Sequence, residues 1–203
     1  VVRHSAEALA AAGITPIVVA IPEGADDVAA AALTGIPGVR CVTGGASRQK
    51  SVRHALEALA ADAPHNVLIH DAARPVLPGA VIERLLAALS IAPGAIPVLP
   101  VVDSLTGANG HLMGDPARRE QLRRVQTPQA FRYADIMAAH HNWSGIEEAG
   151  DDAQVAQAAG LPVALVEGDE RLHKLTYAND FTAELPPIRV GTGYDVHRLA
   201  AGE

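Results

Sequence analysis

The sequence predicts an α/β protein built around a three-layer, mostly parallel sheet, with one β-arm protruding from it. Apolar runs of strand length alternate with stretches of helical periodicity along most of the 203 residues. This alternation lapses at residues 106–132, a polar stretch rich in glycine and arginine. Such alternation is typical of parallel strands joined by crossover helices, and the lapse predicts an excursion from the main sheet.

Each element of the amino-terminal half is expected from its periodicity and from the residues that end it. A helix over residues 3–12 stops at Gly13, because glycine commonly terminates helices. Pro97 and Pro100 favour an edge or irregular position for the strand that contains them, because proline cannot donate to a sheet ladder. The remaining elements are strands at residues 16–21, 39–42, 66–70 and 95–101, and helices at residues 25–33, 49–60 and around 81–89.

The carboxyl-terminal half resumes the pattern after the arm. Strand-like pieces at residues 111–113 and 122–126 lie within the excursion. A Leu-Pro-Pro break at residues 185–187 precedes a new apolar start and is the best candidate for a linker. Between arm and linker we expect helices at residues 133–141 and 152–159 and strands at residues 163–166 and 172–175.

Composition limits the partners of this chain. The formal net charge is −7, with no basic run, and aromatic residues make up 3%. Both facts disfavour binding to nucleic acid or to an anionic membrane. No apolar run approaches membrane-spanning length, and the first residues lack the layout of a signal peptide. Cys41 is the only cysteine, which fits a reducing compartment, so we expect a cytoplasmic protein.

Asp71 and Arg74 stand where chemistry is expected in an open α/β sheet. They follow the apolar strand at residues 66–70, and ligands bind at the carboxyl ends of such strands. A carboxylate there suits magnesium, and a nearby arginine suits phosphate. The alternative is that Asp71 caps a turn and Arg74 is a solvated surface charge.

A glycine-rich turn leads from the strand at residues 39–42 into the next helix. Gly44 and Gly45 allow close approach of the backbone, and Arg48 and Ser51 add side chains that can contact phosphate or ribose. The alternative is a plain strand–helix turn in which Ser47 is the N-cap.

Cations gather on the arm and near the carboxyl end. A lysine inside an apolar context, Lys174, lies either at an edge or directed into a site. Clustered arginines on an arm suggest an anionic ligand or an interface, or simply a solvated face. The cluster consists of Arg118, Arg119, Arg123 and Arg124, just before Thr127.

Other polar pairs allow two interpretations. Ser104 follows Asp103 at a strand end, and Asp151-Asp152 opens a helix, where capping is the default explanation. His140 and His141 are expected to be exposed on a helix. Asp195 and His197 have the period-two spacing of two zinc ligands on a strand, or are a turn residue and a surface histidine.

Taken together, these segments resemble the 2-C-methyl-D-erythritol 4-phosphate cytidylyltransferase family of the non-mevalonate isoprenoid pathway. The closing stretch, residues 188–198, is similar to the opening strand of 2-C-methyl-D-erythritol 2,4-cyclodiphosphate synthase. The matching pieces occur in family order: Gly44-Gly45-x-x-Arg48-x-x-Ser51-Val52, His70-Asp71-Ala-Ala-Arg74-Pro75, Asp103-Ser104, Thr127-Pro128-Gln129, Asp151-Asp152-Ala153, and Val166-Glu167-Gly168 with Lys174.

The resemblance implies a Rossmann-like, nucleotidyltransferase-like fold and a role for each matching residue. Asp71 would hold Mg²⁺ and meet the substrate, with Lys174 and Arg119 as the other catalytic residues. Arg119 and Thr127 would reach the neighbouring subunit's site from the arm. Nucleotide binding would fall to Gly45, Arg48, Ser51 and Ala72, and substrate binding to Arg74, Ser104 and Thr127, with Lys174 and the Gly150 backbone also facing the substrate.

The same resemblance implies two domains and a dimer. Residues 1–185 would form the cytidylyltransferase domain, lacking its amino-terminal strand and glycine-rich loop, and residues 186–203 the linker and the start of the synthase domain. Zn²⁺ or another divalent metal would bind Asp195 and His197 as part of an incomplete site. CTP and methylerythritol phosphate would be the substrates, the 106–132 arm would form a homodimer, and the synthase portion could build a higher oligomer.

Two other functions stay open on the sequence. One is a different nucleotidyltransferase of similar fold that acts on another sugar phosphate. The other is a non-catalytic dimerisation module.

Overall fold

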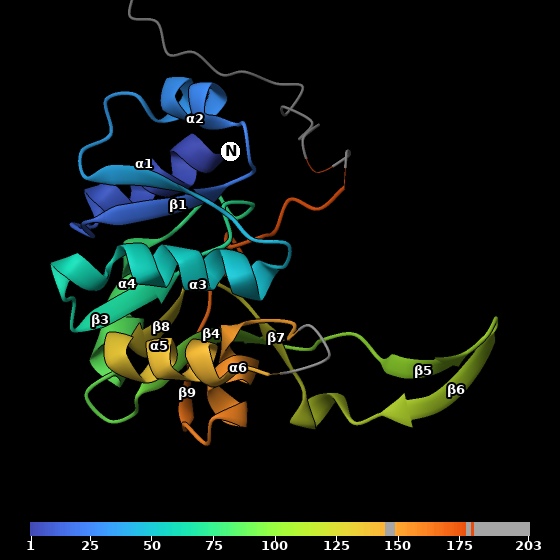
Figure 1. The fold of residues 1–203 in the computed structure, drawn as a ribbon. Helices are drawn as coiled ribbons and strands as arrows, with labels where there is room; N and C mark the ends of the chain where they lie inside the picture. The colour runs from blue at the N-terminus through green and yellow to red at the C-terminus, as the bar shows by residue number, and fades with distance from the viewer. Residues whose placement is uncertain (145–148, 178–179, 181–203) are drawn as a thin grey trace, which may run out of the picture.

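The computed structural model describes residues 1–144, 149–177 and 180 (Figure 1). The helices are α1 (Val2–Ala11), α2 (Asp26–Leu33), α3 (Arg48–Ala58), α4 (Gly79–Ala88), α5 (Tyr133–Asn142) and α6 (Asp152–Ala158), with short 3₁₀ turns η1 (Ala60–Asp62) and η2 (Arg119–Gln121). The strands are β1 (Ile17–Ile21), β2 (Val39–Thr43), β3 (Asn66–Ile69), β4 (Gly94–Pro100), β5 (Leu105–Asn109), β6 (Leu112–Ala117), β7 (Arg123–Val125), β8 (Gln129–Arg132) and β9 (Val163–Glu167).

The predicted α/β class and the β-arm are confirmed, and the sheets are of mixed direction. β1 and β2 form a small parallel sheet. In the larger sheet β4 pairs with β9 in parallel, whereas β8 runs antiparallel between β3 and β4. β5 and β6 form a separate hairpin, the arm, which extends away from both sheets (Figure 1).

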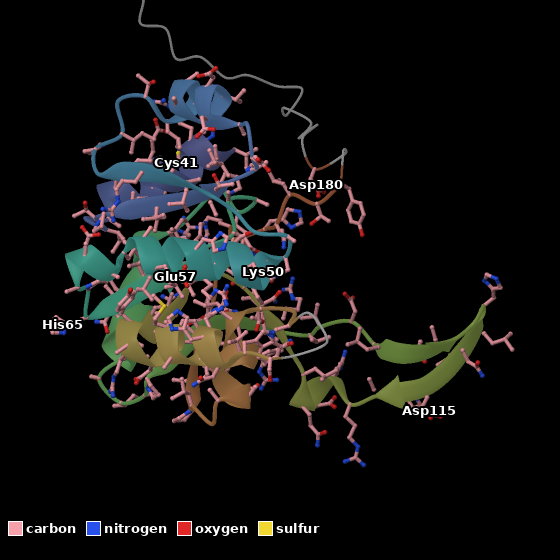
Figure 2. The ribbon with its side chains drawn as sticks, viewed as in Figure 1. Cys41, Lys50, Glu57, His65, Asp115 and Asp180 are labelled. Carbon is pink, nitrogen blue, oxygen red and sulfur yellow. The ribbon has the colours of Figure 1, made fainter. Side chains whose placement is uncertain are left out.

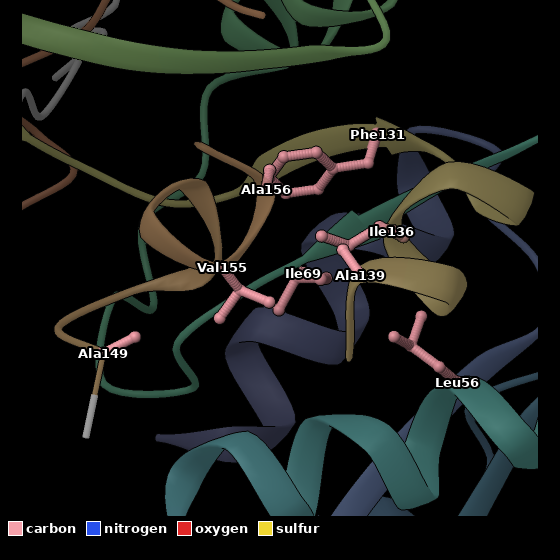
Figure 3. Close-up of a cluster of buried hydrophobic side chains, with 8 residues drawn as sticks. All are labelled: Leu56, Ile69, Phe131, Ile136, Ala139, Ala149, Val155 and Ala156. Carbon is pink, nitrogen blue, oxygen red and sulfur yellow. The ribbon is translucent and has the colours of Figure 1, made fainter. Parts of the chain in front are cut away.

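Helices cover both faces of the larger sheet, because successive strand side chains point to opposite sides. On β8, Ala130 packs with α4 on one face, and Phe131 packs with α5 and α6 on the other. Figure 3 shows the second cluster, in which Leu56 of α3 and Ile69 of β3 belong to the same group of buried side chains as Phe131 and Ile136. The predicted three layers are therefore present.

The sequence predicts an edge or an irregular position for the strand at residues 95–101; the strand is central, so the edge position is wrong. β9 occupies one side of β4, and β7 and β8 share the other. Pro97 is accommodated because β7 and β8 are interrupted opposite it. Its carbonyl accepts from Gln126 N–H at 2.9 Å, and a residue's N–H and C=O point to the same side of a strand. The missing donor of Pro97 therefore faces a break in the sheet and not a regular ladder.

Two further expectations need correction. The excursion is shorter than residues 106–132, because β7 and β8 return to the main sheet after the hairpin. No strand forms at residues 172–175; there Leu172 N–H bonds back to Asp169 in a turn, and Leu175 N–H donates to the Ala73 carbonyl. A buried side chain, Leu172, anchors this segment to the core beside α4.

A cavity of about 460 Å³ separates β1 from β3. Within the described residues these two strands belong to different sheets, so each has an edge without a strand partner. Apolar side chains from α1, α3 and the two strands line the cavity, among them Leu9, Val19, Leu56 and Val67. At one end its lining becomes polar, with Arg48 and Asp71.

We predict that Phe131→Ala destabilises the fold by about 3–5 kcal/mol, because it removes a ring that is 1% exposed and leaves a cavity between β8, α5 and α6. Ile91→Ala is the control, since Ile91 is 82% exposed and its loss should stay within about 0.5 kcal/mol. Urea unfolding followed by circular dichroism measures both. Equal effects of the two substitutions would contradict the placement of Phe131.

Candidate active site

The candidate site begins where β3 ends. Asp71 follows the strand by two residues, and its carbonyl accepts from Arg74 N–H at 2.9 Å, which closes a tight turn. Lys50 marks the amino-terminal end of α3, on the side from which the arm extends, whereas Glu57 and His65 lie toward the opposite side (Figure 2). The site therefore faces the side of the molecule that carries the arm.

Three cations surround the Asp71 carboxylate. Lys174 Nζ lies 3.0 Å from Asp71 Oδ2, Arg74 Nε lies 3.9 Å from the same atom, and Arg48 Nη2 lies 3.6 Å from Oδ1. They come from three separate parts of the chain: the segment after β9, the turn after β3 and the first turn of α3. The sequence predicted Asp71, Arg48, Arg74 and Lys174 as site residues, and the structure brings these four together.

These charges keep the Asp71 carboxylate ionised. Burial alone would raise its pKa, but the hydrogen bond and charge of Lys174, with the charges of Arg48 and Arg74, outweigh burial and hold the pKa below its ordinary value. Burial also lowers the pKa of Arg74, although an arginine stays charged. The local excess of positive charge suits an anionic ligand such as a phosphate.

A chain of hydrogen bonds fixes the turn that carries Asp71. The Asp71 N–H donates to Thr127 Oγ1 at 3.0 Å, and Thr127 Oγ1 lies 3.2 Å from His70 Nδ1. His70 Nε2 lies 3.0 Å from the Arg74 carbonyl, to which it must donate. Nδ1 is then the acceptor from the Thr127 hydroxyl, so the neutral imidazole satisfies every partner, and burial lowers the pKa of His70 accordingly.

Thr127 lies in the break between β7 and β8, where it is 4% exposed and bonds within its own chain. This placement differs from the expectation that it reaches a neighbouring subunit from the arm. β8 pairs Gln129 with Ile69 of β3, so Thr127 comes to lie beside the residues that follow β3. A substrate-binding role for Thr127 stays a prediction.

The glycine-rich turn forms the wall of the site beside α3. Gly45 N–H donates to Ser51 Oγ at 3.0 Å, and Ser47 Oγ caps α3 by accepting from Lys50 N–H. A Cβ at Gly45 would overlap Lys50, so only glycine fits there. Both interpretations of this stretch hold in part: Ser47 is an N-cap, and Arg48 and Ser51 line the same cavity as Asp71 and Ala72.

Two polar residues of the site region escaped the functional interpretation of the sequence. Asp152 is fully buried and bonds to Arg48, and His140, expected to be exposed, is 3% exposed and contacts Asp152. Helical spacing carried a signal for both: Val155 and Ala156 follow Asp152 on its face, and Ile136 precedes His140 by one turn, all three being buried. The neighbouring Asp151 is the N-cap of α6, as the sequence predicts, because its side chain accepts from Gln154 N–H.

The other predicted site residues are not assembled around Asp71. Ser104 is exposed between β4 and β5, and Arg119 lies on η2, where it bonds to the Val102 carbonyl and pairs with Glu120. Asp195 and His197 lie outside the described residues. Among the residues that the structure describes, no group of three or more histidine, cysteine, aspartate or glutamate side chains could hold a metal, and no helix is long and apolar enough to cross a membrane.

The fold and the cation cluster at the end of β3 define a nucleotidyltransferase-like α/β protein. Residues 1–185 match the family model described as "2-C-methyl-D-erythritol 4-phosphate cytidylyltransferase". Because that match spans most of the chain, the chain belongs to this cytidylyltransferase family.

Curated relatives and solved structures agree with the family. A "Bifunctional enzyme IspD/IspF" from Erythrobacter litoralis is 64% identical in a match that covers all of this chain and 53% of the relative. A protein of the same description from Novosphingobium aromaticivorans is 61% identical in a match that covers 99% of this chain and 53% of the relative. The chain thus spans about half the length of the curated relatives it matches. The solved cytidylyltransferase from Thermus thermophilus is 40% identical, with a TM-score of 0.74 over 86% of this chain and 83% of that one.

We predict that Thr127→Val destabilises the fold by about 1–3 kcal/mol, because it leaves the Asp71 N–H and His70 Nδ1 without their shared partner. Thr127→Ser keeps the hydroxyl and should cost clearly less. Urea unfolding of the two variants beside the parent chain decides this. A loss in Thr127→Ser as large as that in Thr127→Val would contradict the prediction, because the hydroxyl that Thr127→Ser keeps would then not protect the fold.

Proposed function

We propose that the whole protein transfers a cytidylyl group from CTP to 2-C-methyl-D-erythritol 4-phosphate. The observation that carries this proposal is the cluster of Lys174, Arg74 and Arg48 around Asp71, in a chain of the cytidylyltransferase family. A phosphate oxygen of the acceptor attacks the α-phosphorus of CTP in line. The bond from that phosphorus to the bridging oxygen breaks, and pyrophosphate leaves with the electron pair.

Positioning and charge stabilisation carry such a transfer, and no covalent enzyme intermediate is required. Lys174 and Arg74 would hold the acceptor phosphate, since they stand on the Oδ2 side of Asp71. Arg48, Ser51 and the backbone at Gly45 and Ala72 would hold the nucleotide. Bringing two anions together is costly, and these cations offset their repulsion.

The residues present fit a magnesium ion held largely by substrate phosphates. Mg²⁺ commonly takes one or two protein carboxylates plus phosphate oxygens and water, and Asp71 supplies one ionised carboxylate beside the proposed phosphates. When bound, the ion would neutralise phosphate charge. The incoming phosphates would then replace Asp71 as the partners of Lys174 and Arg48.

The cavity between β1 and β3 supports the proposal that one more strand pairs there. Another part of the longer protein would supply that strand. Both strands present a bare edge to it, and α1 and α3 supply apolar walls. The carboxyl ends of β1 and β3 lie at the same end of α3: the Ile21 carbonyl accepts from Gly44 N–H beside the start of α3, and Arg48 contacts Asp71. An inserted strand parallel to both would deliver a following loop to the site.

The arm supports a homodimer. Leu112 and Met113 on β6 are 73% and 78% exposed. Neighbouring apolar side chains that are this exposed are typical of a surface that binds another protein chain. A second copy would bury them, and would place Arg119, at the base of the arm, near the partner's Asp71.

A second catalytic domain is proposed from the relatives and from the end of the sequence. The relatives named as bifunctional are about twice as long as this chain. Residues 186–203 would then be the linker and the start of a cyclodiphosphate synthase domain, in which Asp195 and His197 are two zinc ligands, with further ligands from the rest of the longer protein. A higher oligomer would form through that domain.

We expect Asp71→Asn in the full-length protein to reduce turnover by about two orders of magnitude or more, because it removes the charge that organises the cations and the proposed metal. Asp27→Asn, an exposed carboxylate in the first turn of α2, is the control and should keep normal turnover. Pyrophosphate release with CTP and methylerythritol phosphate is the measurement.

Near-normal turnover of Asp71→Asn would overturn its assignment. A parent protein that released pyrophosphate only with a different sugar phosphate would favour the alternative nucleotidyltransferase. If it bound no nucleotide at all, the dimerisation module would be the better description.

Mixing two inactive variants tests the shared site. Equal amounts of Asp71→Asn and Arg119→Ala subunits should recover about a quarter of parent activity, since about half of freely exchanging dimers are hybrids with one intact site each. Unmixed variants are the controls. If each subunit used its own Arg119, every site in the hybrid would be defective and mixing would restore nothing.

A further inference from the structure

A charged side chain is buried completely beside the candidate site. Asp152, in the first turn of α6, is 0% exposed. Its Oδ2 lies 2.7 Å from Arg48 Nη2, and its Oδ1 lies 3.1 Å from His140 Nε2. The carboxylate therefore joins three helices, α3, α5 and α6, through hydrogen bonds.

The stability of the fold alone is a weak explanation for a buried carboxylate such as that of Asp152. Removing a carboxylate from water is expensive, and apolar residues of similar volume often serve a core equally well. Here the carboxylate has two partners, so its burial is compensated, but little net stabilisation remains. Because burial of this carboxylate costs free energy and takes place beside a candidate active site, it points to a role for Asp152 in that site.

Arg48 stands between two carboxylates. Its Nη2 is 2.7 Å from Asp152 but 3.6 Å from Asp71, so the closer partner is the one outside the site. Burial alone would lower the pKa of Arg48, but the charge and hydrogen bond of Asp152, helped by the charge of Asp71, outweigh burial and raise that pKa. Nη1 is buried and has no hydrogen-bond partner among the described residues, so the guanidinium has one unused donor group.

His140 completes the arrangement from α5. A ring nitrogen that faces a carboxylate oxygen donates to it, so the imidazole occupies Oδ1 and leaves Oδ2 for Arg48. The side chain is 1% exposed, and its helix packs in the same core as Val155 and Ala156 of α6. The position of the carboxylate is thus set from two sides.

We propose that Asp152 and His140 are positioning residues that hold Arg48 away from Asp71 and present it to the bound nucleotide. Without Asp152, the guanidinium would close the 3.6 Å gap to Asp71 and neutralise the carboxylate that the site needs. The proposal rests on the proposed function only in that CTP binds beside Arg48. It assigns no contact with substrate to Asp152 or His140.

A double-mutant cycle in the full-length protein tests this, with CTP affinity measured by calorimetry in the presence of magnesium. Asp152→Asn should weaken CTP binding about tenfold, the loss expected for one charge-assisted hydrogen bond. In an Arg48→Ala background the same substitution should have almost no further effect, because Asp152 acts through Arg48. Asp152→Glu keeps the charge and should recover part of the affinity.

His140→Gln gives a second, milder variant, which keeps an N–H donor and changes CTP affinity less than Asp152→Asn. Its matched control is His141→Gln, the exposed neighbour on the same helix, which should bind CTP as the parent does. Urea unfolding of every variant separates folding from binding. Should Asp152→Asn fail to fold, the cycle is run with His140→Gln and Arg48→Ala.

Two results would overturn the proposal. One is that the effects of the Asp152 and Arg48 substitutions multiply, which would make the two residues independent. The other is a loss of stability with unchanged CTP affinity, which would make Asp152 structural only. A parent protein that binds CTP but transfers nothing to methylerythritol phosphate would refute the proposed function, while the binding cycle would still decide the role of Asp152.

Discussion

The short antiparallel strand β8 is the constraint on which most of this structure depends. Its side chains reach both faces of the larger sheet: Ala130 packs against α4, Phe131 fills the core beneath α5 and α6, and Gln129 Oε1 accepts from Ala153 N–H at the start of α6. The break just before it delivers Thr127 to the turn that carries Asp71. One strand of four residues therefore sets both cores and one wall of the candidate site.

Charge balance explains why the site is open to anions. Three cations, Arg48, Arg74 and Lys174, face two carboxylates, Asp71 and Asp152, so one positive charge is left over in a chain whose formal net charge is −7. Such a local reversal of charge draws phosphate groups to one point. The side chains of Arg48 and Lys174 are 31% and 49% exposed, more than those of Asp71 and Asp152, so these two cations face the ligand side.

Within the described residues, the arm and the edges of β1 and β3 both leave apolar surface that the chain itself does not cover. The arm presents two strongly exposed apolar side chains, Leu112 and Met113, and the edges border an apolar cavity. The cavity reaches the candidate site through its polar end, whereas the arm carries Arg119 at its base, which is proposed to reach the partner's site. The proposed second copy and the proposed added strand would act by the same physical logic, since each would bury apolar surface and bring polar groups to Asp71.

The sequence by itself determined the α/β class, most helices and strands, and the grouping of Asp71 and Arg74 at a strand end. Those features follow from periodicity and from local turn chemistry, which depend on nearby residues. The glycine-rich turn and an apolar context made Arg48 and Lys174 candidates, the family resemblance gave them their roles, and the structure brings both to Asp71.

Only the tertiary structure decided the place of β4, the existence of β8 and the burial of Asp152 and His140. β8 is too short to show a period, and Pro97 is tolerated centrally because the strand opposite it breaks. A charged residue at a helix start looks like a cap, as Asp151 is; that Asp152 turns inward depends on Arg48, which lies 104 residues away in the chain. Contacts between distant residues set these outcomes, and local patterns do not encode them.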